Sequence, residues 1–192
     1  MVKNGVDLDL FAKKYDVPSD MAKIKFPVIG FGGKITHLFD YTLYNNVVKS
    51  HPDKNFVIVG QILDKEVFRK IEKAPNVFYL GDKHYSQYPS YVKNFNVGIV
   101  PYVTGSLEHG ADSIKVYEYI AAGLNVIGTS GAGMTDLQEY IHVAKNWKEF
   151  SEQIDNALKP KLVAVVTLPK FYTWKYKADS FIQLFKEIVS AK

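Results

Sequence analysis

Short and almost uninterrupted apolar runs recur along the whole chain, and they constrain its fold more than any other feature. The runs cover residues 27–33, 55–60, 76–81, 97–102, 125–130 and 141–145. A strand with one face in water alternates apolar and polar residues, whereas a strand buried on both faces is apolar throughout. The runs therefore predict parallel strands in the middle layer of an α/β protein.

Helical patterns fill the intervals between these runs. They cover residues 40–50, 64–73, 85–95, 113–122 and 146–158, and a last amphipathic stretch covers about 177–190. Pro89 is expected in the first turn of its helix, where a missing N–H is tolerated. This alternation predicts a Rossmann-like, doubly wound parallel sheet of about six strands with helices on both faces. Residues 162–166 fit either a strand or a buried segment.

Composition excludes several classes of protein. The 192 residues include no cysteine, so disulfides and thiolate metal sites are excluded. The longest apolar run is far shorter than the ~20 residues that a membrane helix needs. The net charge is +4, but Arg69 is the only arginine and no basic cluster interleaves with aromatic residues. A nucleic-acid partner is therefore not expected.

The histidines and one acidic motif do not indicate a metal site. The five histidines show no metal-ligand spacing. His51 and His84 are expected at the surface, and no catalytic role is expected for His109. Asp7 and Asp9 match a DxD metal motif, but no buried strand precedes them, so we attribute the match to chance.

Two strand ends carry residues that suit a ligand, because ligands of open α/β sheets lie beyond the carboxyl ends of the strands. The first is GFGGK, residues 30–34, where glycines after a buried strand would let the backbone approach a ligand closely. Neither a dinucleotide fingerprint nor a P-loop is present, because Ile35 stands where each motif needs another residue. A tight turn with a solvated Lys34 is the simpler alternative.

The second strand end leads through a loop into ADSIKVYEYIAAG, residues 111–123. Asp112 is expected to cap this helix, with Ser113 as the alternative. Lys115 and Glu118 are neighbours on one helix face, so a surface ion pair is one interpretation. The other is a nucleotide site, in which the helix start and the lysine hold phosphate and the glutamate accepts hydrogen bonds from a diol. The apolar face should comprise Ile114, Tyr117, Ile120 and Ala121.

The order and spacing of these segments resemble the C-terminal, nucleotide-sugar-binding half of GT-B glycosyltransferases, in the bacterial polysaccharide branch near glycosyltransferase family four. The segments that carry the resemblance are NGVDLDLF, VIGFGGKI, FVIVG, NVFYLG, YSQYPSYVKNFNVGIVPY, SIKVYEYIAAGLNVIGTS and FYTWKYKA. The resemblance implies that residues 1–192 form a single donor-nucleotide-binding domain. Its closing helix, at about 177–190, would cross back towards an N-terminal acceptor domain that this chain lacks.

The resemblance also implies a role for each matching residue. Lys34 and Lys115 would be catalytic, because they would stabilise the departing diphosphate. The other donor-binding residues would be Gly32, Gly33, Asp112, Ser113, Ile114 and Glu118, the last of these on the ribose. The residues near the base would be Gly81, Asp82 and Tyr85. Gly110 stands where many family members carry a glutamate that contacts the sugar, which leaves the identity of the sugar open.

The function implied by the resemblance is that of a glycosyltransferase. It would bind a nucleoside diphosphate sugar, most simply a UDP-sugar, and transfer a hexosyl or glucuronosyl unit to a glycan or lipid-linked acceptor. The whole enzyme would be cytoplasmic, and it could associate peripherally with the inner face of the membrane. It would need no metal or other cofactor.

Without the acceptor domain, the chain is expected to be nearly inactive and to expose an apolar face around the closing helix. The alternative is a non-catalytic, flavodoxin-like α/β module for protein interaction, in which Lys115 and Glu118 serve stability only.

Overall fold

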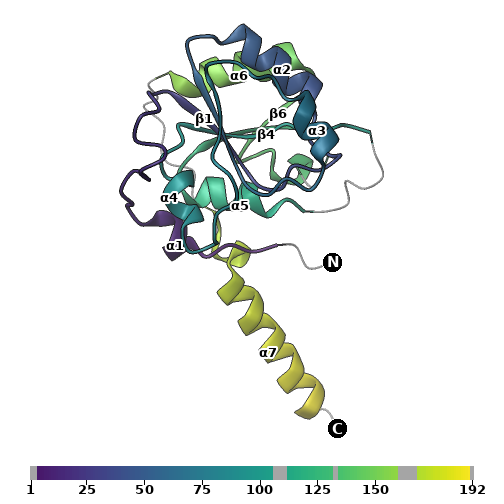
Figure 1. Ribbon diagram of the computed structural model, residues 1–192. Helices are drawn as coiled ribbons and strands as arrows, with labels where there is room; N and C mark the ends of the chain where they lie inside the picture. The colour runs from purple at the N-terminus through teal and green to yellow at the C-terminus, as the bar shows by residue number, and fades with distance from the viewer. Residues whose placement is uncertain (1–3, 106–111, 132–133, 160–167, 191–192) are drawn as a thin grey trace.

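A six-stranded parallel sheet lies at the centre of the described chain (Figure 1). The computed structural model of the protein describes residues 4–105, 112–131, 134–159 and 168–190. The strands are β1 (Val28–Gly32), β2 (Asn55–Val59), β3 (Val77–Tyr79), β4 (Val97–Val100), β5 (Asn125–Thr129) and β6 (His142–Ala144). Their order across the sheet is β3-β2-β1-β4-β5-β6, and every neighbouring pair is parallel. The predicted doubly wound, Rossmann-like α/β fold is confirmed.

Helices cover both faces of this sheet (Figure 1). One layer contains α2 (Tyr41–Ser50), α3 (Lys65–Lys70) and α6 (Trp147–Leu158). The other layer contains α1 (Leu8–Ala12), α4 (Tyr88–Val92) and α5 (Ile114–Ala121). Two short 3-10 helices, η2 (Met134–Leu137) and η3 (Lys170–Tyr172), complete the body. Pro89 lies in the first turn of α4, as predicted. The ambiguous stretch at 162–166 falls outside the described residues.

The helix α1 is an element that the sequence did not predict. Its cap is Asp7, whose carboxylate accepts a hydrogen bond from the Leu10 N–H at 2.9 Å. A side-chain oxygen that caps a helix in this way satisfies a donor that the helix itself leaves unpaired. The acidic residue of the DxD match therefore has a structural role at this cap.

His51 is buried, with 2% of its surface exposed, so its predicted surface position is wrong. Its Nδ1 lies 2.9 Å from the carbonyl oxygen of Val47, and its Nε2 lies 3.4 Å from the carboxylate of Asp155 on α6. The ring therefore joins the end of α2 to α6, a tertiary contact that no local pattern reveals. His84 is exposed, as predicted, and His109 lies outside the described residues.

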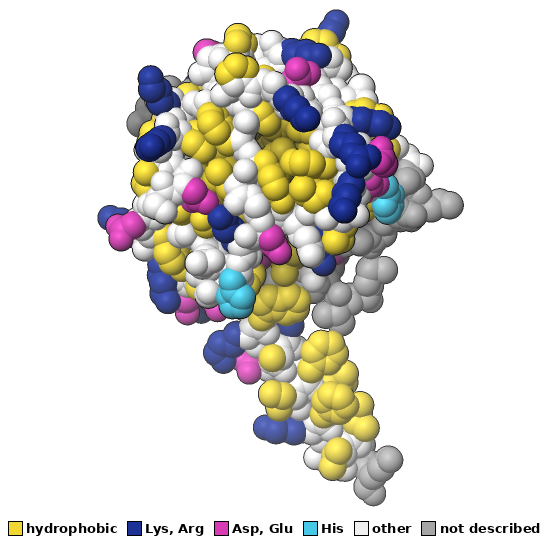
Figure 2. All heavy atoms as spheres, viewed as in Figure 1, with side chains coloured by type: hydrophobic (Ala, Val, Ile, Leu, Met, Phe, Trp, Pro, Cys, Tyr) yellow, Lys and Arg dark blue, Asp and Glu magenta, His cyan; other side chains and the backbone are white. Residues whose placement is uncertain are grey.

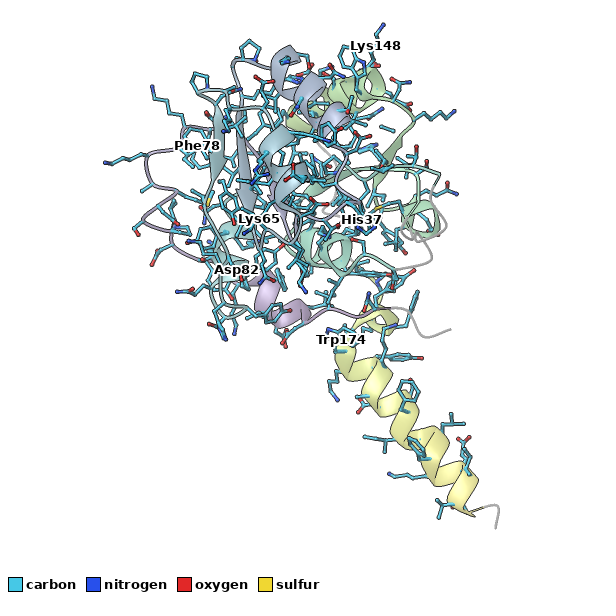
Figure 3. All side chains as sticks on the ribbon, turned by 45° about the vertical axis from the view of Figure 1, so that its right-hand side comes forward. His37, Lys65, Phe78, Asp82, Lys148 and Trp174 are labelled. Carbon is cyan, nitrogen blue, oxygen red and sulfur yellow. The ribbon has the colours of Figure 1, made fainter. Side chains whose placement is uncertain are left out.

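The last helix, α7 (Trp174–Ser190), projects from the body (Figure 1). It begins at Trp174, near the body (Figure 3), rather than at the predicted 177. None of its residues is buried, and its apolar side chains lie open along the helix (Figure 2). The expected exposed apolar face is present, with Phe181, Leu184, Phe185 and Ile188 each 43–65% exposed. Among the helices described, none is long and apolar enough to cross a membrane.

The strand order reverses between β1 and β4, which makes this pair the switch point of the sheet. The β1–β2 register continues to Gly32 and Val59, whereas the β1–β4 register ends at Gly30 and Gly98. The two central strands therefore separate as they reach their carboxyl ends. In open α/β sheets, ligands bind at this position.

Candidate functional site

A cavity of about 650 Å³ lies at the carboxyl ends of the strands beside the switch point. Its walls come from the turns after β1, β2, β3 and β4 and from the first turns of α5. The sequence-predicted residues that line it are Gly32, Gly33, Lys34, Asp82, Tyr85, Ile114, Lys115 and Glu118. Asp82, labelled in Figure 3, stands in the turn after β3. The fold thus gathers into one cavity residues that lie far apart in the sequence.

Lys115 is a buried cation in the wall of this cavity, with 9% of its surface exposed. Its Nζ donates to the hydroxyl of Tyr102 and lies 4.8 Å from the centre of that ring. The Phe31 ring lies on another side, 5.6 Å from Nζ. Contact with a hydroxyl and two ring faces holds an ammonium group in place without neutralising its charge. The surface position that an ion pair with Glu118 would give Lys115 is therefore not observed.

Glu118 is a carboxyl group buried in the same cavity, with 4% of its surface exposed. Burial raises its pKa to about 7, although the charge of Lys115 and a hydrogen bond with Tyr85 act in the opposite direction. Burial also raises the pKa of Tyr85 to about 12, and the nearby Glu118 charge adds to that rise. Because Lys115 and Glu118 are both buried, they do not form the surface ion pair that was one interpretation of the sequence.

The start of α5 follows the predicted alternative. Ser113, rather than Asp112, is the N-cap residue, although its side chain makes no capping hydrogen bond. The Asp112 carboxylate instead accepts hydrogen bonds from the Tyr117 hydroxyl at 2.7 Å and from the backbone N–H of Asn4. Because the Asp112 carboxylate is bound by Tyr117 and Asn4, it does not cap the first turn of α5. Within the described part of the chain, neither Asp112 nor Ser113 lines the cavity.

The burial of α5 also departs from its predicted apolar face. All residues from Lys115 to Ile120 are buried, whereas Ile114 is 36% exposed at the cavity and Ala121 is partly exposed. The reason is that α5 packs against the sheet on one side and against α1 on another. A helix covered on several sides does not show a single apolar face.

The glycines after β1 make room for neighbouring side chains. A Cβ atom at Gly32 would lie 2.1 Å from the hydroxyl oxygen of Tyr88, and one at Gly33 would lie 2.6 Å from Cε of Lys115. Gly33 also has a φ of +148°, a backbone conformation that residues with a Cβ atom rarely adopt. The N–H of Gly33 donates to the carbonyl of Val59 at 2.8 Å. The next residue, Lys34, is exposed and lines the cavity.

The turn after β3 carries the residues predicted near the base. Gly81 accepts a hydrogen bond from the N–H of Gly60 at 2.9 Å, while Asp82 and Tyr85 line the cavity. Lys83, which lies between them in the sequence, also lines it. Its Nζ lies 2.8 Å from the carboxylate of Asp20, which holds the charge at the rim.

Other cavity residues that sequence reasoning missed fall into two groups. The first group lies at the ends of strands or in the segments after them, so the rule for strand ends could have identified its members, which are Thr36, Leu38, Val59, Gly60, Gln61 and Tyr102. Tyr88 comes from α4, and no pattern in the sequence indicated that it would reach the cavity. In the part of the chain that is described, no group of three or more His, Cys, Asp or Glu side chains could hold a metal ion.

Comparison with known proteins places these features in a family. The family model described as Glycosyl transferases group 1 matches residues 27–160. The protein TuaH of Bacillus subtilis (strain 168), named as a teichuronic acid biosynthesis glycosyltransferase, is 28% identical over 142 residues. That alignment covers 72% of this chain and 36% of TuaH.

Solved structures share the fold. The structure of Anabaena Alr3699/HepE in complex with UDP matches 82% of this chain and 47% of its own, with a TM-score of 0.65 and 16% identity. The structure of AviGT4, a glycosyltransferase involved in avilamycin A biosynthesis, matches 100% of this chain and 58% of its own, with a TM-score of 0.66 and 11% identity. The chain thus spans between 36% and 58% of the length of these relatives.

Proposed function

The chain belongs to the family Glycosyl transferases group 1, and from that premise we propose that it binds the sugar donor of a glycosyltransferase. The donor is a nucleoside diphosphate sugar, and a UDP-sugar is favoured because related structures contain UDP or UDP-glucose. The observation that carries the proposal is the burial of Lys115 and Glu118 in one cavity at the switch point. A fixed cation beside a hydrogen-bond acceptor matches a diphosphate next to a ribose.

In this proposal, Lys115 and Lys34 stabilise the leaving group. Sugar transfer breaks the bond between the anomeric carbon and a diphosphate oxygen, so negative charge develops on the diphosphate. Lys115 is held in the cavity wall by its contacts with Tyr102, so it needs little reorganisation to meet that charge. Glu118 would accept hydrogen bonds from the ribose hydroxyls and so fix the nucleotide along the cavity wall. None of these roles requires a metal ion.

The transferred unit and the acceptor are finer parts of the same proposal. We place this chain as a single donor-binding domain of a larger enzyme that transfers a hexosyl or glucuronosyl unit to a glycan or lipid-linked acceptor. The similarity to TuaH, named as a teichuronic acid biosynthesis glycosyltransferase, supports a role in glycan synthesis, and this chain covers 36% of TuaH. The chain alone would therefore bind nucleotide and transfer sugar poorly, because the acceptor site and any general base would lie outside it.

Calorimetric titration of the 192-residue chain with UDP tests the proposal. UDP should bind, and Lys115→Ala should weaken binding by roughly 10- to 100-fold, since a hydrogen bond to a charged group is worth about 1.5–3 kcal/mol. Lys148→Ala is the matched control, because Lys148 lies on α6 in the opposite helix layer (Figure 3). It should bind UDP like the unaltered chain. The proposal fails if no nucleoside diphosphate produces a response.

A further inference from the structure

The hydroxyl of Tyr119 lies at the point where β4 separates from β1. Backbone N–H groups alternate in direction along a strand, and the Gly33 N–H donates to Val59 on the β2 side. The Gly32 N–H therefore faces the β4 side, where the described β1–β4 register has already ended at Gly30. It donates instead to the Tyr119 hydroxyl at 2.6 Å. This hydroxyl takes the place that a backbone carbonyl of β4 would hold.

Packing fixes the Tyr119 side chain in this position. It is fully buried, and its ring packs edge-on against Phe95 with 6.4 Å between ring centres. The ring also lies on the backbone of β4, where a Cβ atom at Gly98 would come within 2.4 Å of it. Tyr119 directly follows Glu118 in α5. Lys115 and Glu118 therefore line the cavity, while the neighbouring Tyr119 lies beneath the cavity and packs against β4.

A second tyrosine touches the same glycine without bonding to it. The Tyr88 hydroxyl lies where a Cβ of Gly32 would be, and it is buried without a hydrogen-bond partner of standard geometry among the described residues. Two buried phenols thus meet Gly32, but only that of Tyr119 pairs with its N–H.

We propose that Tyr119 is a positioning residue, whose hydroxyl fixes the Gly32 peptide and, through it, the turn that carries Lys34 to the diphosphate. This inference rests on the proposed function of the cavity. Without the hydroxyl, the Gly32 N–H would be buried and unpaired, so the turn would shift to find another partner. Lys115 comes from α5 and does not depend on the Gly32 peptide. The loss should therefore affect the contact made by Lys34 and spare the rest of the site.

The test compares Tyr119→Phe with Tyr44→Phe in the full 192-residue chain. UDP affinity is measured by calorimetry and uridine affinity by NMR titration. Tyr119→Phe should weaken UDP about tenfold, the loss of roughly one hydrogen bond, and leave uridine binding unchanged. Only UDP carries the phosphates that this turn would meet. Tyr44→Phe removes a buried hydroxyl on the α2 side of the sheet, away from the cavity, and should bind both ligands like the unaltered chain. The effects of Tyr119→Phe and Lys34→Ala on UDP should be less than additive.

The backbone amide signal of Gly32 provides a readout that does not depend on a variant. In the unaltered chain, UDP should shift this signal and uridine should not. If UDP leaves the signal unchanged, the inference is wrong, even where Tyr119→Phe fails to fold.

Equal weakening of UDP and uridine would show that the Tyr119 hydroxyl supports the fold only, which overturns the inference. Unchanged UDP affinity in Tyr119→Phe, with Lys115→Ala still defective, would also overturn it. Absence of UDP binding to the unaltered chain would overturn the proposed function itself, and this inference with it.

Discussion

Glu118 links the pH dependence of folding to the candidate site. Its pKa rises from an ordinary value of 4.5 to about 7 in the folded chain, mainly because the carboxyl group is buried. The folded state therefore holds a proton that the unfolded state releases between these two values. This contribution to stability is fully present below pH 4.5 and is lost as the pH rises through 7.

Glu118→Gln should remove that pH dependence, because the amide has the shape of the protonated acid and does not titrate. At pH 8 the variant should be more stable than the unaltered chain by at most about 3 kcal/mol, and near pH 4 the two should be similar. Urea denaturation at both pH values measures the difference. An equal difference in stability between the variant and the unaltered chain at both pH values would show that folding does not shift the pKa of Glu118. Glu118→Gln should also lose nucleotide affinity if the Glu118 carboxylate binds the ribose.

Tyr44 is also a buried polar side chain, but the structure shows no role for its hydroxyl. Its hydroxyl is buried on the α2 side of the sheet and has no hydrogen-bond partner among the described residues. Burial raises its pKa well above the usual range. Tyr44→Phe should therefore raise the free energy of unfolding by about 1 kcal/mol, since it removes an unpaired polar group. Chemical denaturation should detect this gain, and a loss would mean that the hydroxyl is hydrogen-bonded in solution.

At the scale of elements, α7 and α6 are both amphipathic, but only α6 is packed. The apolar side chains of α7, such as Phe181 and Phe185, are 43% and 65% exposed, whereas Phe150 of α6 is fully buried. The double variant Phe181→Lys, Phe185→Lys should leave the melting temperature of the body unchanged and reduce self-association in sedimentation experiments. Phe150→Ala should cost about 3–5 kcal/mol. A large loss of stability in the α7 variant would mean that this helix packs on the body.

The elements that could be predicted are those with a strong local signal. All six described strands lie within predicted runs. The inner strands β1, β2, β4 and β5 are buried over nearly their whole length, so they must be apolar throughout. The helix α1, at Leu8–Ala12, was missed because five residues are too few to show a helical period. α3 and α4 are shorter than predicted, and α7 begins earlier, since periodicity fixes the centre of a helix better than its ends.

The residues of the candidate site could be predicted only in part, because several depend on contacts between distant segments. Lys115 and Glu118 were correctly placed on one helix, but their burial comes from the sheet and from α1, which helical periodicity does not describe. Asp112 was the expected cap, yet it binds Asn4, which lies 108 residues away. Tyr88 and Tyr119 gave no local signal, since their importance comes from meeting Gly32.

At the scale of the whole molecule, the topology brings the ends of several strands and the start of α5 around one cavity. Backbone hydrogen bonds join the turns after β1, β2 and β3, whereas the β1–β4 ladder ends before it reaches the cavity. A nucleotide in the cavity would contact both sides of the switch point at once. Binding should therefore stabilise the entire sheet, and it should order the carboxyl ends of the strands more than their amino ends.

UDP at about 100 times its dissociation constant should raise the melting temperature by roughly 5–10 °C, because a ligand that binds only the folded state adds about 2.7 kcal/mol at that concentration. Hydrogen exchange should slow in the turns after β1, β2 and β3 and in the first turn of α5, since these line the cavity. The contact between α2 and α6 around His51 lies at the amino-terminal ends of the strands and should show no direct protection. Lys115→Ala should reduce both effects at the same UDP concentration, because a 10- to 100-fold weaker affinity leaves only about 0.4–1.4 kcal/mol of stabilisation. Stabilisation of unchanged size in this variant would place the nucleotide elsewhere on the protein.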